Sequence, residues 1–262
     1  SCISKIAGDV EVLVPDIASA YRSRMKVADL GSAEEIQIFE KTEQDISEAG
    51  IKFKNDLEVI RVTMNPPSLD DTMPDNERLS WAVEDLCEAE DVRISFQVLQ
   101  KLAENLRKYS FDVQCVIRRK GNKVEICDLI GAKETPMVAG LAVDIGTTTV
   151  SAVLVDMLTG KILAKGSAGN GQIRYGADVI NRIIEQQKVG GRKRLQDAII
   201  GETLNPLIDS MCREASVQEE QIFRVCVASN TTMNHLLLGV DADPVRMEPY
   251  IPTFFKTNSL FA

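Results

Sequence analysis

The stretch Gly140-Leu-Ala-Val-Asp-Ile-Gly-Thr-Thr-Thr-Val150 decides the fold of the second half of this chain. Its apolar start favours a strand that ends at Asp144, and a second β-branched run occupies residues 150–155. Two such runs around a short turn predict a β-hairpin. Gly146, inside the turn, allows a close backbone approach and φ values that other residues avoid.

The residues of this turn suit the phosphates of a nucleotide. The backbone N–H groups and hydroxyls of Thr147, Thr148 and Thr149 can donate hydrogen bonds to phosphate oxygens. Asp144, at the end of the strand, is placed to hold a hydrated Mg²⁺, which needs only one or two carboxylates. We therefore expect a site for Mg²⁺ and nucleotide phosphates, and the alternative is an ordinary hairpin with a Gly-Thr turn.

The chain after the hairpin predicts a third strand, two helices and a fourth strand. They should occupy residues 161–167, 177–188, 192–215 and 222–228, and the last strand should be buried. Pro206 should kink the second helix because its ring displaces a backbone hydrogen bond. This order of elements is not that of a Rossmann fold, and the sequence contains neither GxxxxGKS nor GxxxxGKT. The nucleotide site is therefore of another kind.

The first of these helices should bury one apolar face. Its apolar residues recur at the spacing of a helix and are Val179, Ile180, Ile183 and Ile184. Upstream, residues 57–137 predict a separate small α/β unit with a strand, two helices and a hairpin.

The chain resembles the superfamily of acetate and sugar kinases, heat-shock chaperone ATPases and actin. Within that superfamily it is most similar to the ATP-dependent reductive activators of corrinoid proteins. The segments that carry the resemblance are residues 66–71, 75–79, 140–149, 170–183 and 229–233. Two positions depart from the family pattern: Gly171 stands where proline is usual, and Ser229 where glycine is usual. Both are small residues at turns, so we expect the geometry to survive.

The resemblance implies an α/β chain of four parts. Residues 1–16 would be the tail of a ferredoxin-like domain that binds a 2Fe-2S cluster, and residues 17–56 a linker. Residues 57–137 would form a small α/β middle domain, and residues 138–262 the first lobe, incomplete, of an actin-like (ribonuclease H-like) ATPase domain. Cys2 would be the last cluster ligand, and only the full-length protein would hold the cluster, so we expect this chain to be a fragment.

The resemblance also implies an activity and its site. ATP hydrolysis with Mg²⁺ would accompany transfer of one electron from the 2Fe-2S cluster to a partner corrinoid protein, converting Co(II) to Co(I). The expected catalytic residues are Asp144, Asn230 and Thr231. The expected ATP-binding residues are Gly146, Thr147, Thr148, Thr149, Asn170 and Gln172.

Each assignment outside the turn has a structural alternative. Asn170 and Gln172 could instead cap the helix predicted at residues 177–188, and Asn230 and Thr231 could simply cap the helix that follows them. His235 fits either a packing role or a corrinoid ligand. For the whole protein the alternatives are a small-molecule kinase of the same superfamily, an activator of a radical dehydratase and a non-catalytic scaffold.

Composition narrows the class of protein. The net charge of −9 argues against nucleic acid as a partner. The six cysteines have no CxxC spacing and are accompanied by one histidine, which argues against a zinc site. The sequence has neither an apolar run long enough to span a membrane nor a signal-peptide pattern. We expect a cytoplasmic protein without membrane contact, and a homodimer stays open.

Overall fold

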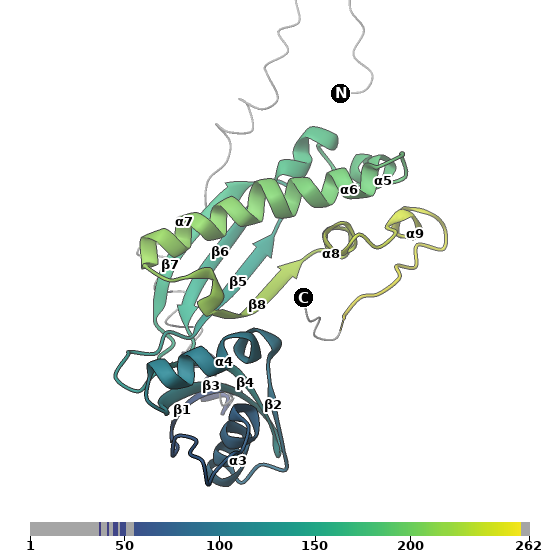
Figure 1. Ribbon diagram of the computed structural model, residues 1–262. Helices are drawn as coiled ribbons and strands as arrows, with labels where there is room; N and C mark the ends of the chain where they lie inside the picture. Colours follow the sequence, from purple (N-terminus) through teal and green to yellow (C-terminus); the bar gives the residue numbers. More distant parts are fainter. Residues whose placement is uncertain (1–36, 38–40, 42–43, 47, 51–54, 258–262) are drawn as a thin grey trace, which may run out of the picture.

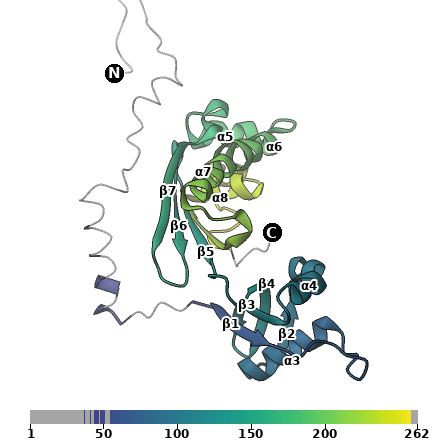
Figure 2. The ribbon, with the colours of Figure 1, turned by 60° about the vertical axis from the view of Figure 1, so that its left-hand side comes forward.

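The computed structural model describes residues 37, 41, 44–46, 48–50 and 55–257. The predictions for residues 1–16, Cys2 among them, and for most of the linker at 17–56 lie outside these residues. The described chain forms two four-stranded sheets, each with its own helices and hydrophobic core (Figures 1 and 2). The mixed α/β class is therefore confirmed.

The first sheet belongs to residues 57–131. Its elements are β1 (Leu57–Thr63), α3 (Asp75–Cys87), β2 (Asp91–Ile94), α4 (Phe96–Lys108), β3 (Asp112–Lys120) and β4 (Lys123–Gly131). The strand order is β1-β3-β4-β2, with β2 parallel to β4 and the other neighbours antiparallel. The predicted strand, helix pair and hairpin are present, and the sequence analysis missed only β2, whose four residues are too few to show a period.

The core of this unit lies between the helices and one face of the sheet. Side chains that are almost fully buried there include Leu79 and Val83 from α3 and Leu102 and Leu106 from α4. They pack against alternate strand residues, because successive side chains of a strand point to opposite faces. The strand residues of the cluster include Val113, Cys115, Ile117, Val124 and Ile126.

The second sheet contains the predicted hairpin. Its strands are β5 (Ala139–Ile145), β6 (Thr149–Asp156), β7 (Ile162–Gly169) and β8 (Ile222–Ser229). The order is β7-β6-β5-β8, so the predicted meander is confirmed, and β8 runs parallel to β5. Along β5, Leu141, Val143 and Ile145 are buried on one face, whereas Ala142 and Asp144 are exposed on the other.

Helices cover the face of this sheet that bears Leu141 and Val143. They are α5 (Val179–Gln186), α6 (Gly191–Gln196), the π-helical segment η2 (Asp197–Leu204) and α7 (Asn205–Ala215). Figure 2 shows them together on one side of β5, β6 and β7. The 3-10 segment η1 (Gly171–Tyr175) connects β7 to them, and η3 (Glu219–Gln221) connects α7 to β8.

The backbone hydrogen bonds of the helix are displaced next to Pro206, as the sequence suggested. The single helix predicted at 192–215 is present as α6, η2 and α7, and its irregularity lies before the proline, where η2 is π-helical. Asn205 donates its amide hydrogen to the carbonyl of Ile200, five residues back. Proline cannot donate such a bond, and its ring collides with the carbonyl four residues earlier. The wider turn ahead of Pro206 is the local adjustment to that conflict.

Two predictions of burial in this unit are wrong. In β8, predicted to be buried, Val225 is 54% and Val227 40% exposed, because this strand pairs only with β5 among the described residues. In α5, Ile180 is 47% exposed and Ile184 42%, although both belonged to the expected apolar face. Arg182 of the same helix is fully buried instead.

After β8 the chain forms α8 (Thr231–Leu238) and α9 (Asp243–Arg246), followed by a segment without regular structure. The two sheets also touch one another: Leu57, Val116 and Val138 form a small buried cluster between them, against which Met157 and Phe223 pack. Within the part of the chain that the structure describes, no helix combines the length and the apolar character that crossing a membrane requires.

Candidate functional site

The turn after β5 and the loop after β8 lie at the same end of the second sheet. The two strands are parallel neighbours, with Asp144 opposite Ala228 and Ile145 opposite Ser229. In open α/β sheets, ligands bind beyond the carboxyl ends of the strands. The register therefore brings together the two segments that the sequence analysis had singled out, residues 144–149 and 229–233.

Three consecutive carbonyl groups of the turn are held by donors from other segments. The side-chain nitrogen Nδ2 of Asn170 lies 2.8 Å from the carbonyl oxygen of Gly146. Nη2 of Arg182 lies 2.5 Å from the carbonyl oxygen of Thr147. The backbone amide of Asn170 lies 2.8 Å from the carbonyl oxygen of Thr148. Asn170 and Arg182 are both buried, so these carbonyls point into the protein.

The amides of the turn are left available as a consequence. In a trans peptide unit the C=O of one residue and the N–H of the next point in opposite directions. With the carbonyls of Gly146 and Thr147 directed inward, the N–H groups of Thr147 and Thr148 are directed away from the interior. Within the described residues these two amides have no hydrogen-bond partner, and neither do the hydroxyls of Thr147, Thr148 and Thr149. A turn with free donors of this kind fits an anion.

Gly146 is required by a close backbone approach. A Cβ atom at this position would lie 2.8 Å from the carbonyl oxygen of Thr149, which also accepts the amide hydrogen of Gly146 at 2.9 Å. Gly146 is not among the described glycines with positive φ, so the expectation of an unusual φ is wrong. Contact with Thr149, rather than backbone conformation, explains the glycine.

Asp144 lies at the end of β5 on the face of the sheet that the helices leave open, and it is exposed. Its carboxylate makes no hydrogen bond or ion pair with any described residue. The described chain also has no cluster of three or more His, Cys, Asp or Glu residues able to hold a metal ion. A metal that demands several protein ligands does not fit, whereas Mg²⁺ with one carboxylate, water and phosphate oxygens does.

Asn170 and Gln172 lie beneath the turn rather than on its open side. Asn170 caps η1 by accepting the amide hydrogen of Gln172 at 3.0 Å, while its Nδ2 holds the turn. Gln172 is buried and donates through Nε2 to the carbonyl oxygen of Leu195 at 2.9 Å. The helix that follows, α5, is capped by Asp178. The alternative in which Asn170 and Gln172 cap that helix is therefore wrong.

Asn230 caps α8, as the structural alternative for it had proposed. Its Oδ1 accepts the amide hydrogen of Met233 at 2.9 Å. The residue is exposed, and its Nδ2 has no partner among the described residues, so this amide nitrogen can still donate a hydrogen bond. Thr231 is half-buried at the first position of α8.

His235 has a packing role. Nε2 accepts the amide hydrogen of Thr253 at 3.2 Å, so the proton must be on Nδ1, which lies 2.7 Å from the carbonyl oxygen of Thr231. The ring is fully buried and stacks on Phe254 with 4.3 Å between centroids. Both nitrogens are used, which leaves none for a corrinoid ligand.

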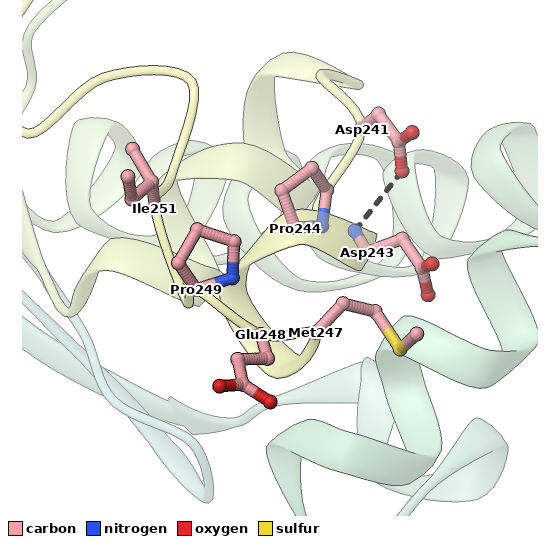
Figure 3. Close-up of a pocket in the computed structure, with 7 residues that line it drawn as sticks. All are labelled: Asp241, Asp243, Pro244, Met247, Glu248, Pro249 and Ile251. Carbon is pink, nitrogen blue, oxygen red and sulfur yellow. Dashed lines mark hydrogen bonds between the residues drawn. The ribbon is translucent and has the colours of Figure 1, made fainter.

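A separate cavity of about 230 Å³ lies beside α9 (Figure 3). Its lining consists of Asp241, Asp243, Pro244, Met247, Glu248, Pro249 and Ile251. The pKa of Asp241 is lowered because its carboxylate accepts the amide hydrogen of Asp243 at 3.0 Å and a hydrogen bond from Gln187 at 2.8 Å. With three acidic side chains in its wall, this cavity is a poor site for phosphate, and no residue of the turn lines it.

Comparison with known proteins supplies the family. The family model described as the RACo linker region matches residues 46–135, and the one described as the RACo middle region matches residues 139–262. The chain is similar to a curated protein of Eubacterium limosum named corrinoid activation enzyme RamQ, with 35% identity over 120 residues, which is 45% of this chain and 20% of that protein.

A solved structure agrees with these matches. It is described as a reductive activator for corrinoid, iron-sulfur protein, and it matches with a TM-score of 0.64 and 32% identity over 77% of this chain and 32% of its own. The chain thus spans between a fifth and a third of the relatives it matches. The fold is that of a small α/β domain followed by part of an actin-like lobe, as the sequence predicted.

Proposed function

From its membership of the RACo family, whose linker and middle regions this chain carries, we propose that the protein is an ATP-dependent reductive activator of a corrinoid protein. It hydrolyses ATP while one electron passes from a reduced 2Fe-2S cluster to Co(II) of the partner, giving an oxidised cluster and Co(I). The cluster is held in the full-length protein, with Cys2 as one ligand.

The observation that carries this proposal is the arrangement of the turn at residues 146–149. Its carbonyls are held from inside by Asn170 and Arg182, and its amides and hydroxyls are free on the outside. Preorganised donors of this kind stabilise anions without having to reorganise when the anion arrives. An ordinary hairpin has no need of a buried arginine and a buried asparagine under its turn.

Each residue of the candidate site has a proposed role in binding or hydrolysing ATP. The amides of Thr147 and Thr148 and the threonine hydroxyls hold phosphate oxygens, and Asp144 orients the water shell of Mg²⁺. Asn230 and Thr231, at the N-terminus of α8, position the attacking water, for which helix N-termini are suited. ATP with Mg²⁺, when bound, supplies the hydrolysable phosphate bond. Phosphoryl transfer asks mainly for such positioning and charge stabilisation.

ATP can assist the redox step only through differential binding. A site that closes around ATP favours one arrangement of the protein. This shifts the equilibrium between Co(II) and Co(I) by no more than the difference in the affinity of that arrangement for the two states of the partner.

We propose that the partner is a corrinoid protein, that the protein contacts neither nucleic acid nor a membrane, and that it is cytoplasmic.

The test uses the full-length protein. We expect the absorption spectrum of a 2Fe-2S cluster, and formation of Co(I) in a purified corrinoid protein that requires both a reductant and hydrolysable ATP. Co(I) formation at the same rate without ATP would contradict the proposal. Phosphorylation of a sugar or carboxylic acid, without any effect on cobalt, would establish the small-molecule kinase instead.

A further inference from the structure

The buried arginine of α5 occupies an unusual place for a charged side chain. Arg182 is fully buried, whereas Ile180 and Ile184 on the same helix are 47% and 42% exposed. Burying a charged group costs free energy unless hydrogen bonds compensate for the lost water. A helix that exposes two isoleucines while it buries an arginine therefore has a specific use for the guanidinium group.

The contacts of Arg182 join three segments that are distant in the sequence. Nε lies 2.9 Å from the carbonyl oxygen of Gly176, and Nη2 lies 2.5 Å from the carbonyl oxygen of Thr147. Nη1 lies 3.3 Å from the sulfur of Met233 in α8. The planar guanidinium presents these donors in a fixed fork, which a lysine cannot reproduce. One side chain thus links the turn at residues 146–149, the loop after η1 and helix α8.

The contact with Thr147 determines the direction of one particular amide. Its carbonyl and the N–H of Thr148 belong to the same peptide unit and point in opposite directions. By holding the carbonyl inward, Arg182 holds the N–H of Thr148 outward. Asn170 does the same for the preceding peptide unit, through the carbonyl of Gly146. The positive charge of Arg182 also lies beneath the turn, where the protein screens it less than water would.

We propose that Arg182 is a positioning residue of the nucleotide site, which holds the Thr148 amide toward the phosphates without touching them. The inference rests on the proposed ATP-binding function. A merely structural arginine would affect stability alone, whereas a positioning residue affects nucleotide affinity in protein that remains folded.

The test compares two buried arginines in the full-length protein. Arg182→Lys keeps the charge but loses the fork, and Arg182→Met removes both. Arg78 supplies the matched control, since it is 7% exposed, makes hydrogen bonds of 2.6 and 2.9 Å to Asp71 and lies in the other unit. The variants Arg78→Lys and Arg78→Met receive the same measurements. These are the dissociation constant for Mg²⁺-ATP by calorimetry, the thermal unfolding midpoint, and hydrogen exchange of residues 146–149 with and without ATP.

We expect Arg182→Lys and Arg182→Met to weaken Mg²⁺-ATP binding by about tenfold or more, as loss of a hydrogen bond from a charged group predicts. ATP should protect the turn amides from exchange in the wild type and less in these variants. The Arg78 variants should lower the unfolding midpoint and leave the dissociation constant unchanged.

Three other results would overturn the role of Arg182, and one of them would overturn the proposed function as well. Wild-type affinity in a folded Arg182→Lys or Arg182→Met variant overturns this inference and leaves the proposed function standing. Failure of both Arg182 variants to fold also overturns it, because the role is then structural. A wild-type protein that binds no Mg²⁺-ATP overturns the proposed function, and this inference with it.

Discussion

Both carboxylate oxygens of Asp56 lie 2.6 Å from Nη2 of Arg224, which ties the start of β1 to the start of β8. Nη2 of Arg118, in β3, adds a hydrogen bond of 3.2 Å to the carbonyl oxygen of Phe223. The far end of β8 leads directly into Asn230 and the site. The strand that carries one wall of the candidate nucleotide site is therefore fastened at its other end to the first unit.

The Asp56–Arg224 pair should couple the stability of the two units. Both side chains are about one-third exposed, so we expect a coupling free energy of only about 0.5–1 kcal/mol. A double-mutant cycle with Asp56→Asn and Arg224→Met, followed by urea unfolding, measures it. The control is the pair Arg61–Asp112 within the first unit, whose arginine is 63% exposed and whose coupling should be smaller. Zero coupling for Asp56–Arg224 would contradict the prediction.

Acid should weaken the same contact. Burial raises the pKa of Asp56, but the hydrogen bond and charge of Arg224 outweigh burial and leave the pKa below its ordinary value of 3.8. The carboxylate therefore contributes its full stability above 3.8 and loses it as the pH falls through the lower pKa of the folded state. In this window the free energy of unfolding should depend less steeply on pH in Asp56→Asn than in wild type. Equal slopes would show that Asp56 has no part in the acid sensitivity.

Removing the Asp144 carboxylate should abolish ATP hydrolysis without unfolding the protein. The residue is exposed at the end of β5 and has no partner within the described chain, so Asp144→Ala should leave the unfolding midpoint unchanged. Loss of the Mg²⁺ ligand should lower kcat by roughly a hundredfold or more. The control is Asp85→Ala, which removes an exposed aspartate on α3. Normal turnover in Asp144→Ala would refute the role of this carboxylate.

A methyl group at position 146 should open the turn. In Gly146→Ala the Cβ would lie 2.8 Å from the carbonyl oxygen of Thr149, so the backbone must shift. We expect a loss of about 1–3 kcal/mol in stability together with weaker Mg²⁺-ATP binding. Gly201→Ala is the matched control, since its Cβ would have nothing within 4 Å. Calorimetric titration and urea unfolding distinguish them, and wild-type affinity in Gly146→Ala would contradict the mechanism.

The sequence alone was sufficient to predict those strands and turns whose residues show a regular local pattern of apolar and polar side chains. The meander of β5, β6 and β7 was predicted because its strands alternate or are β-branched and are separated by glycine-containing turns. The acid, glycine and threonines in the first turn indicated the candidate site in the same local way, and its role in binding phosphate stays a prediction. These features depend on residues that are adjacent in the chain, which is why a single sequence reveals them.

The remaining features depend on which segments meet in space. Ile180 and Ile184 satisfied the helical period, yet Arg182 is the residue of α5 that is fully buried. Its guanidinium group donates to the carbonyl of Gly176, in the preceding loop, and to the carbonyl of Thr147, which is distant in the sequence. The apolar run of β8 suggested a buried strand, but nothing in the run itself says how many neighbours the strand will have. The signal that could have revealed Arg182 is its place in the segment 170–183, which carried the family resemblance.

In the described part of the chain β8 is the edge strand of its sheet, and this has a practical consequence for preparing residues 1–262 by themselves. Among the residues that the structure describes, one side of β8 has no neighbouring strand, and Val225 and Val227 are exposed on it, so another polypeptide can pair with this edge. We therefore expect residues 1–262, prepared by themselves, to aggregate through this edge strand as the protein concentration rises. A lysine in place of Val225 is the simplest solubilising change, since it puts charge on this edge opposite Leu141, near the start of β5, whereas the turn at residues 146–149 follows the end of that strand.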